Sequence, residues 1–143
     1  RENPLSKKKL GIDIHGVIDQ NPIFATLAKT GLFEVHIVTG IKEELDDVVD
    51  FPYDKWFSIH QECLDRGIDV KYDDKDRPWV DPAIWDKMKA EYCKREGIDI
   101  MIDDSPSYGQ YFEGLSTAYL RYENTQRTNW RKDGSYEPKE SPV

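Results

Sequence analysis

The chain has 143 residues, of which 34% are charged, and its formal net charge at pH 7 is -8. A surface with this charge repels nucleic-acid phosphates, which argues against general binding of DNA or RNA and leaves only a terminal phosphate or a nucleotide as a ligand of that kind. No apolar run approaches the roughly 18 residues of a bilayer-spanning helix, so we expect a cytoplasmic protein with no membrane partner.

The predicted elements alternate between strands and helices. In chain order they are a strand at residues 9–15, a helix at 22–29, a strand at 33–38, helices at 42–49 and 54–66, a strand at 68–72, a helix at 82–96, a strand at 98–102, a short helix at 107–112 and a strand at 115–122. Apolar and β-branched runs indicate the strands. Apolar residues at helical spacing, with proline at the start or glycine after the end, indicate the helices.

This alternation predicts an α/β fold, a three-layer Rossmann-like parallel sheet with helices on both faces. The length is typical of one domain, which we place at residues 1–122. The polar residues 123–143 form a C-terminal tail that lies on the surface or is disordered. Cys63 and Cys93 lack metal-binding spacing and are expected to be reduced thiols, and His36 and His60 are expected to be structural.

Three predicted strands end in residues that can carry chemistry. Asp13 stands at the end of the first strand, just before Gly16, Thr39 ends the second, and Asp103 and Asp104 follow the strand at 98–102. Each feature alone also has a structural reading, because an aspartate can cap a turn and a threonine is ordinary at a strand end. The carboxyl ends of parallel strands meet at one edge of a sheet, however, which predicts that these residues form one site.

The residue types point to phosphoryl transfer. A carboxylate such as Asp13 can attack phosphorus and form an aspartyl-phosphate. The Thr39 hydroxyl, next to a helix start, can contact a phosphate oxygen. Carboxylates about 4 Å apart repel by roughly 4 kcal/mol at an effective dielectric near 20, and Mg²⁺ converts that repulsion between Asp13, Asp103 and Asp104 into binding.

Two further roles are needed for turnover. A positive charge has to stabilise the phosphate oxygens, and Lys75, in the polar loop before the helix at 82–96, is the first candidate, with Lys87 as the alternative. His15, two residues after Asp13, can act as general acid or base for the leaving oxygen. The opposite interpretation is that His15 replaces a working acid and leaves only binding.

These motifs together resemble the haloacid-dehalogenase (HAD) superfamily of Mg²⁺-dependent phosphohydrolases. The family's first motif, Asp-x-Asp-Gly-Val after an apolar strand, is similar to GIDIHGVID, with Asp13 at the nucleophile position. Its second motif resembles HIVTG with Thr39, its lysine motif is loosely similar to KDRPW with Lys75, and its fourth motif resembles IDIMIDDSP. The resemblance covers about residues 9–122 in the family's motif order.

The resemblance implies a phosphatase that acts on a small phosphorylated substrate, such as a nucleotide or sugar phosphate, with Mg²⁺ as cofactor. It also implies that the Asp13 carboxylate, the His15 backbone carbonyl and Asp103 hold the metal. Asp104 then acts on the metal indirectly, through water or through a hydrogen bond to one of these ligands. His15 stands where the family has a second aspartate, the usual general acid or base. Only about twenty residues separate Asp13 from the next strand, so the chain has no room there for an inserted cap domain.

Two alternatives remain open. One is a catalytically weak or inactive HAD-like protein that binds metal and a phospho-ligand. The other is a two-component receiver domain, although in receivers the paired acids come from the first strand rather than a late one. Trp56, Trp79 and Trp85 are expected mainly in the core, with stacking on a base or sugar as the other possibility. The sequence does not indicate an oligomeric state.

Overall fold

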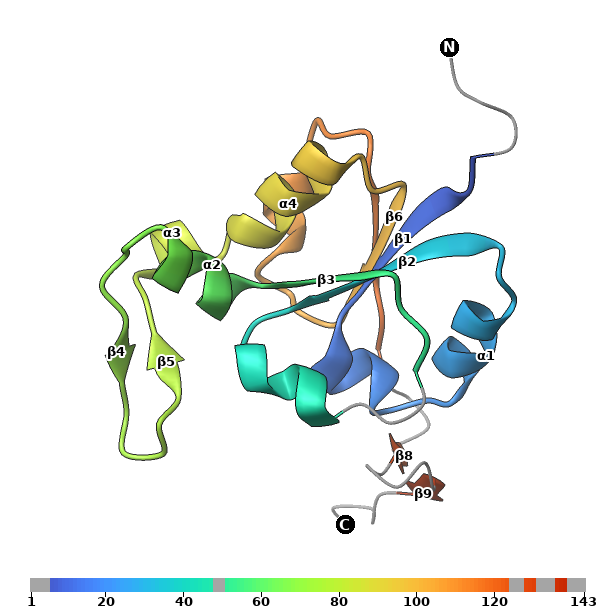
Figure 1. Cartoon of the computed structure of the whole chain (residues 1–143), viewed down its shortest axis with the longest axis horizontal. Coiled ribbons are helices and arrows are strands. Elements are labelled where there is room, and N and C mark those ends of the chain that lie inside the picture. Colours follow the sequence, from blue (N-terminus) through green and yellow to red (C-terminus); the bar gives the residue numbers. More distant parts are fainter. Residues whose placement is uncertain (1–5, 48–50, 124–127, 131–135, 139–143) are drawn as a thin grey trace.

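A five-stranded parallel sheet lies at the centre of the computed structural model, which describes residues 6–47, 51–123, 128–130 and 136–138 (Figure 1). Its strands are β1 (Lys8–Ile12), β2 (Phe33–Thr39), β3 (Lys55–Ser58), β6 (Ile100–Asp103) and β7 (Ala118–Arg121). Their spatial order is β3-β2-β1-β6-β7, and every neighbouring pair is parallel. The α/β prediction with a Rossmann-like parallel sheet is therefore confirmed.

The strand order places a switch point between β1 and β6. When the five strands of the sheet are numbered in chain order, their spatial order is 3-2-1-4-5. The chain therefore moves outward from β1 on one side and then crosses to β6 on the other. Doubly wound sheets bind ligands in the crevice at the carboxyl ends of the strands at such a point. Receiver domains have the order 2-1-3-4-5, so the receiver alternative is excluded.

Helices cover both faces of this sheet (Figure 1). On one face α1 (Ile23–Lys29) buries Phe24 and Ala28 against Leu10 and Ile12 of β1. On the other, α2 (Ile59–Asp65) and α4 (Met88–Glu96) pack against Val38 and Met101. The remaining helical turns are η1 (Ile14–Ile18), η2 (Lys42–Asp47), α3 (Pro82–Trp85) and η3 (Gly109–Phe112). Both cysteines are free and buried, as expected for reduced thiols.

Two predicted elements are corrected by the pairing of their backbones. The predicted helix at 54–66 begins as the edge strand β3, because Trp56 and Phe57 pair in parallel with β2, and only from residue 59 does it become α2. The predicted strand at 68–72 does not join the sheet. Its last two residues form β4 (Lys71–Tyr72), which pairs antiparallel with β5 (Pro78–Trp79) in a separate hairpin that extends away from the sheet (Figure 1).

Other boundaries shift by smaller amounts. The predicted helix at 82–96 divides into α3 and α4, with residues 86 and 87 between them. Within the predicted tail, β8 (Thr128–Trp130) and β9 (Tyr136–Pro138) pair antiparallel, and the rest of residues 124–143 lie outside the described part of the chain. The single-domain boundary at residue 122 stays a prediction. Among the described residues, no helix is long and apolar enough to cross a membrane.

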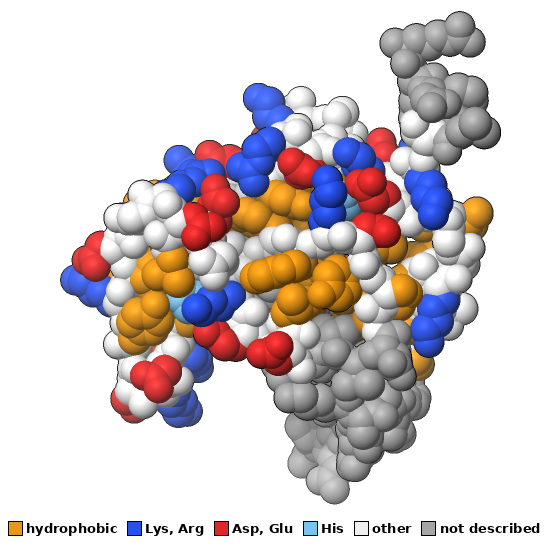
Figure 2. Space-filling model, viewed as in Figure 1, with side chains coloured by type: hydrophobic (Ala, Val, Ile, Leu, Met, Phe, Trp, Pro, Cys, Tyr) orange, Lys and Arg blue, Asp and Glu red, His pale blue; other side chains and the backbone are white. Residues whose placement is uncertain are grey.

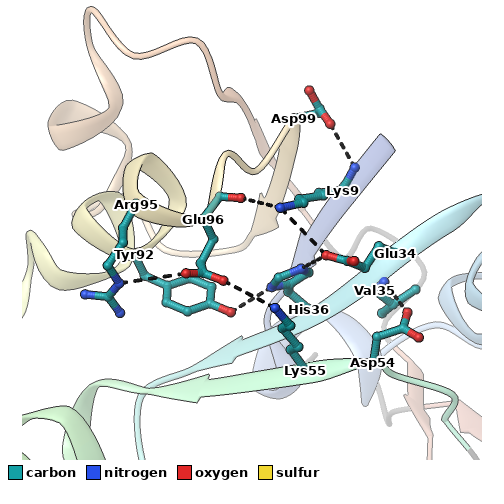
Figure 3. Close-up of polar contacts among 10 residues, drawn as sticks. All are labelled: Lys9, Glu34, Val35, His36, Asp54, Lys55, Tyr92, Arg95, Glu96 and Asp99. Atoms are coloured by element: carbon teal, nitrogen blue, oxygen red, sulfur yellow. Dashed lines mark hydrogen bonds and ion pairs between the residues drawn. The ribbon is translucent and has the colours of Figure 1, made fainter. Parts of the chain in front are cut away.

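A polar network fastens α4 to the amino ends of the strands (Figure 3). The buried His36 ring lies 2.6 Å from the Glu34 carboxylate through Nε2 and 2.7 Å from the Tyr92 hydroxyl through Nδ1. The Lys9 ammonium donates to the backbone carbonyl of Glu96 at 2.7 Å. His36 is thus a structural residue, as expected, and this network lies at the end of the sheet opposite to the carboxyl ends of β1 and β6.

Candidate active site

A cavity of about 240 Å³ opens at the carboxyl ends of β1 and β6, at the switch point of the sheet. Parallel strands direct the residues that follow them toward this edge, so segments far apart in the sequence contribute to one wall. The lining residues are Asp13, His15, Gly40, Ile41, Glu44, Trp85, Lys89, Asp103, Asp104, Ser105 and Tyr108.

Three aspartates converge in this cavity. Asp13 directly follows β1, and its backbone N–H donates to the Ile102 carbonyl at 3.0 Å, which holds it beside β6. One carboxylate oxygen from each of Asp13, Asp103 and Asp104 lies within 4.8 Å of the others. Asp13 and Asp103 are buried, and Asp104 is half-buried. The structure therefore brings together the three acids that the sequence placed at strand ends.

Lys89 supplies the positive charge of the site. Its side chain reaches down from the first turn of α4, with Nζ 2.6 Å from Asp103 Oδ2 and 3.1 Å from Asp13 Oδ1. Lys89 is 1% exposed. Burial alone would lower the pKa of this lysine, but the carboxylates of Asp13 and Asp103 raise it above its ordinary value, so the ammonium stays charged.

The prediction of Lys75 as the cation of the site has to be corrected. Lys75 lies in the turn between β4 and β5, where the Asp73 carboxylate accepts its backbone N–H at 2.9 Å, and its exposed side chain does not line the cavity. Lys87, the alternative, is exposed at the residue before α4 and does not line it either.

A sequence signal for Lys89 was present in the helix pattern. It stands in the stripe Trp85, Met88, Lys89, Tyr92, Cys93, whose spacing marks the buried face of one helix. A lysine is almost never fully buried unless it is paired. A lysine at such a position therefore indicates a buried carboxylate partner.

The carboxylates outnumber the cation. Burial raises the pKa of Asp13 well above its ordinary value, with Lys89 opposing and Asp103 adding to the shift. Burial, and then repulsion from Asp103, raises the pKa of Asp104 as well. With all three carboxylates ionised, the single ammonium would leave two net negative charges, and the raised pKa values of Asp13 and Asp104 reflect the cost of that state without a further cation. Carboxylate oxygens are ligands that Mg²⁺ prefers, so the donor set fits that ion.

Gly16 is required by the position of Asp104. Its φ is +90°, in the left-handed region that favours glycine, and a Cβ added there would clash with the Asp104 carboxylate. The Gly16 N–H donates to Asp19 Oδ1 at 2.8 Å. Gly16 thus allows a carboxylate of the site to approach the backbone closely.

His15 lies at the mouth of the cavity and is held by Asp19. The distance from His15 Nδ1 to Asp19 Oδ2 is 2.6 Å. Burial of Asp19 would raise its pKa, but hydrogen bonds from His15, Gln20 and the Gly16 N–H lower it below its ordinary value. A charged Asp19 orients the imidazole through this contact. Asp19 stands four residues after His15 and was not predicted as a site residue.

Thr39 lies behind the cavity rather than in its wall. The side chain is fully buried, and its hydroxyl donates to the carboxylate of Glu44, which does line the cavity. Glu44 comes from the first turn of η2 and was not predicted as a site residue. In this structure the Thr39 hydroxyl therefore contacts a carboxylate at the position where the sequence predicted a phosphate contact.

Comparison with protein-family models and with curated proteins finds no match to this chain. The chemistry of the site has to follow from its own residues.

Proposed function

We propose that this protein is a Mg²⁺-dependent phosphohydrolase of the HAD-like type, which hydrolyses a phosphomonoester through an aspartyl-phosphate on Asp13. The observation that carries the proposal is the convergence of Asp13, Asp103, Asp104 and Lys89 in one cavity at the switch point. Two excess negative charges in a largely buried site are costly unless a cation binds there. A dianionic phosphate can then enter only together with that cation.

The groups that would hold Mg²⁺ are the carboxylates of Asp13 and Asp103 and the backbone carbonyl of His15, with Asp104 beside them. When bound, Mg²⁺ supplies positive charge for the non-bridging oxygens of the phosphate. Lys89 holds the Asp13 carboxylate in place and adds a second positive charge on the side of α4. This arrangement leaves an oxygen of Asp13 as the nucleophile.

The reaction follows in two steps. A carboxylate oxygen of Asp13 forms a bond to phosphorus while the bond to the leaving oxygen breaks, and protonated His15 donates its proton to that oxygen. Neutral His15 then takes a proton from water, whose oxygen attacks the phosphorus of the aspartyl-phosphate. The bond between Asp13 and phosphorus breaks, inorganic phosphate leaves, and Asp13 and protonated His15 are restored. Asp19 keeps the imidazole oriented in both steps.

The second candidate is a protein that binds metal and a phospho-ligand without turnover. One observation favours it, because the Thr39 hydroxyl is bonded to Glu44 instead of being directed at a phosphate. The replacement of an aspartate by His15 in the first motif agrees with it as well.

Hydrolysis of p-nitrophenyl phosphate with and without Mg²⁺ tests the proposal, and Asp13→Asn is the matched variant. We expect Mg²⁺-dependent turnover that falls by roughly 10³-fold or more in Asp13→Asn. His15→Asp decides the role of the imidazole, since lower turnover identifies His15 as the working acid and higher turnover identifies it as a disabling change. Binding of Mg²⁺ without turnover anywhere between about pH 5 and 9 would establish the second candidate instead.

A further inference from the structure

A second cavity, of about 430 Å³, adjoins the first between the β4–β5 hairpin and α3. The two cavities share Ile41 and Trp85 in their walls. Trp85 is fixed at this boundary, because its Nε1 donates to the Tyr108 hydroxyl at 3.1 Å and its ring lies against Gly40, where an added Cβ would be 3.4 Å away. A molecule with its phosphate at Asp13 would extend past Trp85 into the second cavity.

The walls of the second cavity are mostly apolar and carry several rings. Pro78 and Trp79 of β5, and Pro82 at the start of α3, line it together with Trp85. Trp79 is 57% exposed, so the expectation of a core position is wrong for this tryptophan. Figure 2 shows hydrophobic side chains gathered on the surface where the hairpin meets α2. Exposed aromatic faces beside a cavity of this size are suited to stacking on a planar ring.

One acceptor in the second cavity lacks a partner. Asp86 is half-buried, its pKa is raised by that burial, and its carboxylate makes no hydrogen bond or ion pair to any residue within the described ranges. At the rim, by contrast, Arg77 and Asp73 neutralise each other, with Arg77 Nε 2.8 Å from Asp73 Oδ2. The cavity therefore favours a ring that carries a hydrogen-bond donor over an anionic group.

We infer that the second cavity binds the leaving group of the substrate and that this group is a nucleoside, with its base stacked on Trp79 and a donor of the base or sugar directed at Asp86. The inference rests on the proposed function for the position of the phosphate. It makes the β4–β5 hairpin the element that selects the substrate, in a chain whose first motif leaves no room for a cap domain. Ring stacking and one hydrogen bond distinguish a nucleoside monophosphate from an aliphatic phosphate of equal charge.

Steady-state hydrolysis of adenosine 5′-monophosphate and of glycerol 2-phosphate tests this inference. Loss of one aromatic stacking surface is expected to raise KM for the nucleotide about tenfold in Trp79→Ala, while KM for glycerol 2-phosphate stays unchanged. Tyr72→Ala is the matched control, because Tyr72 is an exposed aromatic residue of the same hairpin that does not line the cavity. Asp86→Ala tests the acceptor independently, including the case in which Trp79→Ala does not fold.

Binding without turnover separates this inference from the proposed function. In the Asp13→Asn protein, adenosine 5′-monophosphate is expected to quench tryptophan fluorescence, and Trp79→Ala in that background is expected to weaken the binding by a similar factor. If no phosphomonoester is hydrolysed but this binding is observed, the proposed function fails and the nucleoside cavity stands. If both esters are hydrolysed with equal KM and Trp79→Ala changes neither, the inference is overturned while the phosphohydrolase stands.

Discussion

Replacing Lys89 by methionine keeps most of the side-chain length but removes the charge that lies between Asp13 and Asp103. At an effective dielectric of about 20, unit charges at the observed 2.6 and 3.1 Å attract by about 6 and 5 kcal/mol. Much of that attraction offsets the desolvation of the buried groups, and breaking such a pair typically costs about 3–5 kcal/mol. We therefore expect the Lys89→Met protein to lose about that free energy of unfolding, with a Tm lower by about 10–15 °C.

Urea and thermal unfolding without Mg²⁺, followed by circular dichroism, measure this loss. Lys87→Met is the control, because it removes an equal charge from an exposed side chain two residues before Lys89. This variant should change the free energy of unfolding by less than about 0.5 kcal/mol. Added Mg²⁺ should restore more stability to Lys89→Met than to the wild type, since a bound cation replaces the missing charge. Equal stability of the two variants would refute the buried contact of Lys89 with the aspartates.

Three further predictions concern the turn after β1 and the network of Figure 3. Gly16→Ala and Gly114→Ala both place alanine at positive φ, at a cost of roughly 1–2 kcal/mol, but only at Gly16 does the new methyl group meet an aspartate of the site. Calorimetry should therefore show weaker Mg²⁺ binding in Gly16→Ala alone, and equal binding in both would contradict the close approach. Tyr92→Phe removes the hydroxyl bonded to His36 and should cost about 1–2 kcal/mol in urea unfolding without changing phosphate hydrolysis, whereas no loss would mean that this bond adds nothing. The hydrogen bond with His36 lowers the pKa of Glu34, so its contribution to stability is present above the ordinary glutamate pKa and is lost as the pH falls through the lowered value. Unfolding free energies between about pH 6 and 3 should accordingly fall less steeply in Glu34→Gln, and parallel pH profiles would argue against this linkage.

The sequence predicted the sheet best where apolar runs are long and end in characteristic residues. The runs that became β1, β2 and β6 are bounded by Asp13, Thr39 and Asp103, and these boundaries located the edge of the sheet where the site lies. The pattern at residues 54–66 was misleading, because its apolar residues fit helical spacing. Trp56 and Phe57 instead lie in an edge strand of four residues, whose conformation depends on pairing with β2.

The missing parts of the site came from residues whose partners are distant in sequence. The sequence favours Lys75 because it stands in a loop before a helix, yet the Asp73 side chain organises that loop into a hairpin turn. Lys89 lies inside a helix, where a lysine is ordinarily exposed, so its position in the chain alone does not favour it. Its partners Asp13 and Asp103 are 76 and 14 residues away, so the packing of α4 on the sheet is needed to identify which carboxylates these are.

The position of α4 connects the two ends of the sheet. Its first turn carries Lys89 into the acidic cavity, while Tyr92 and Glu96, one and two turns later, join the network with His36 and Lys9 at the amino ends of the strands (Figure 3). These contacts at its far end help to hold α4, and with it Lys89, in position over the sheet. The network is built from groups that satisfy one another, whereas the cavity keeps more carboxylates than cations. The excess of carboxylates makes the metal-free site unfavourable relative to the site with a bound cation. A phosphate monoester can then bind beside that cation, which offsets its negative charge.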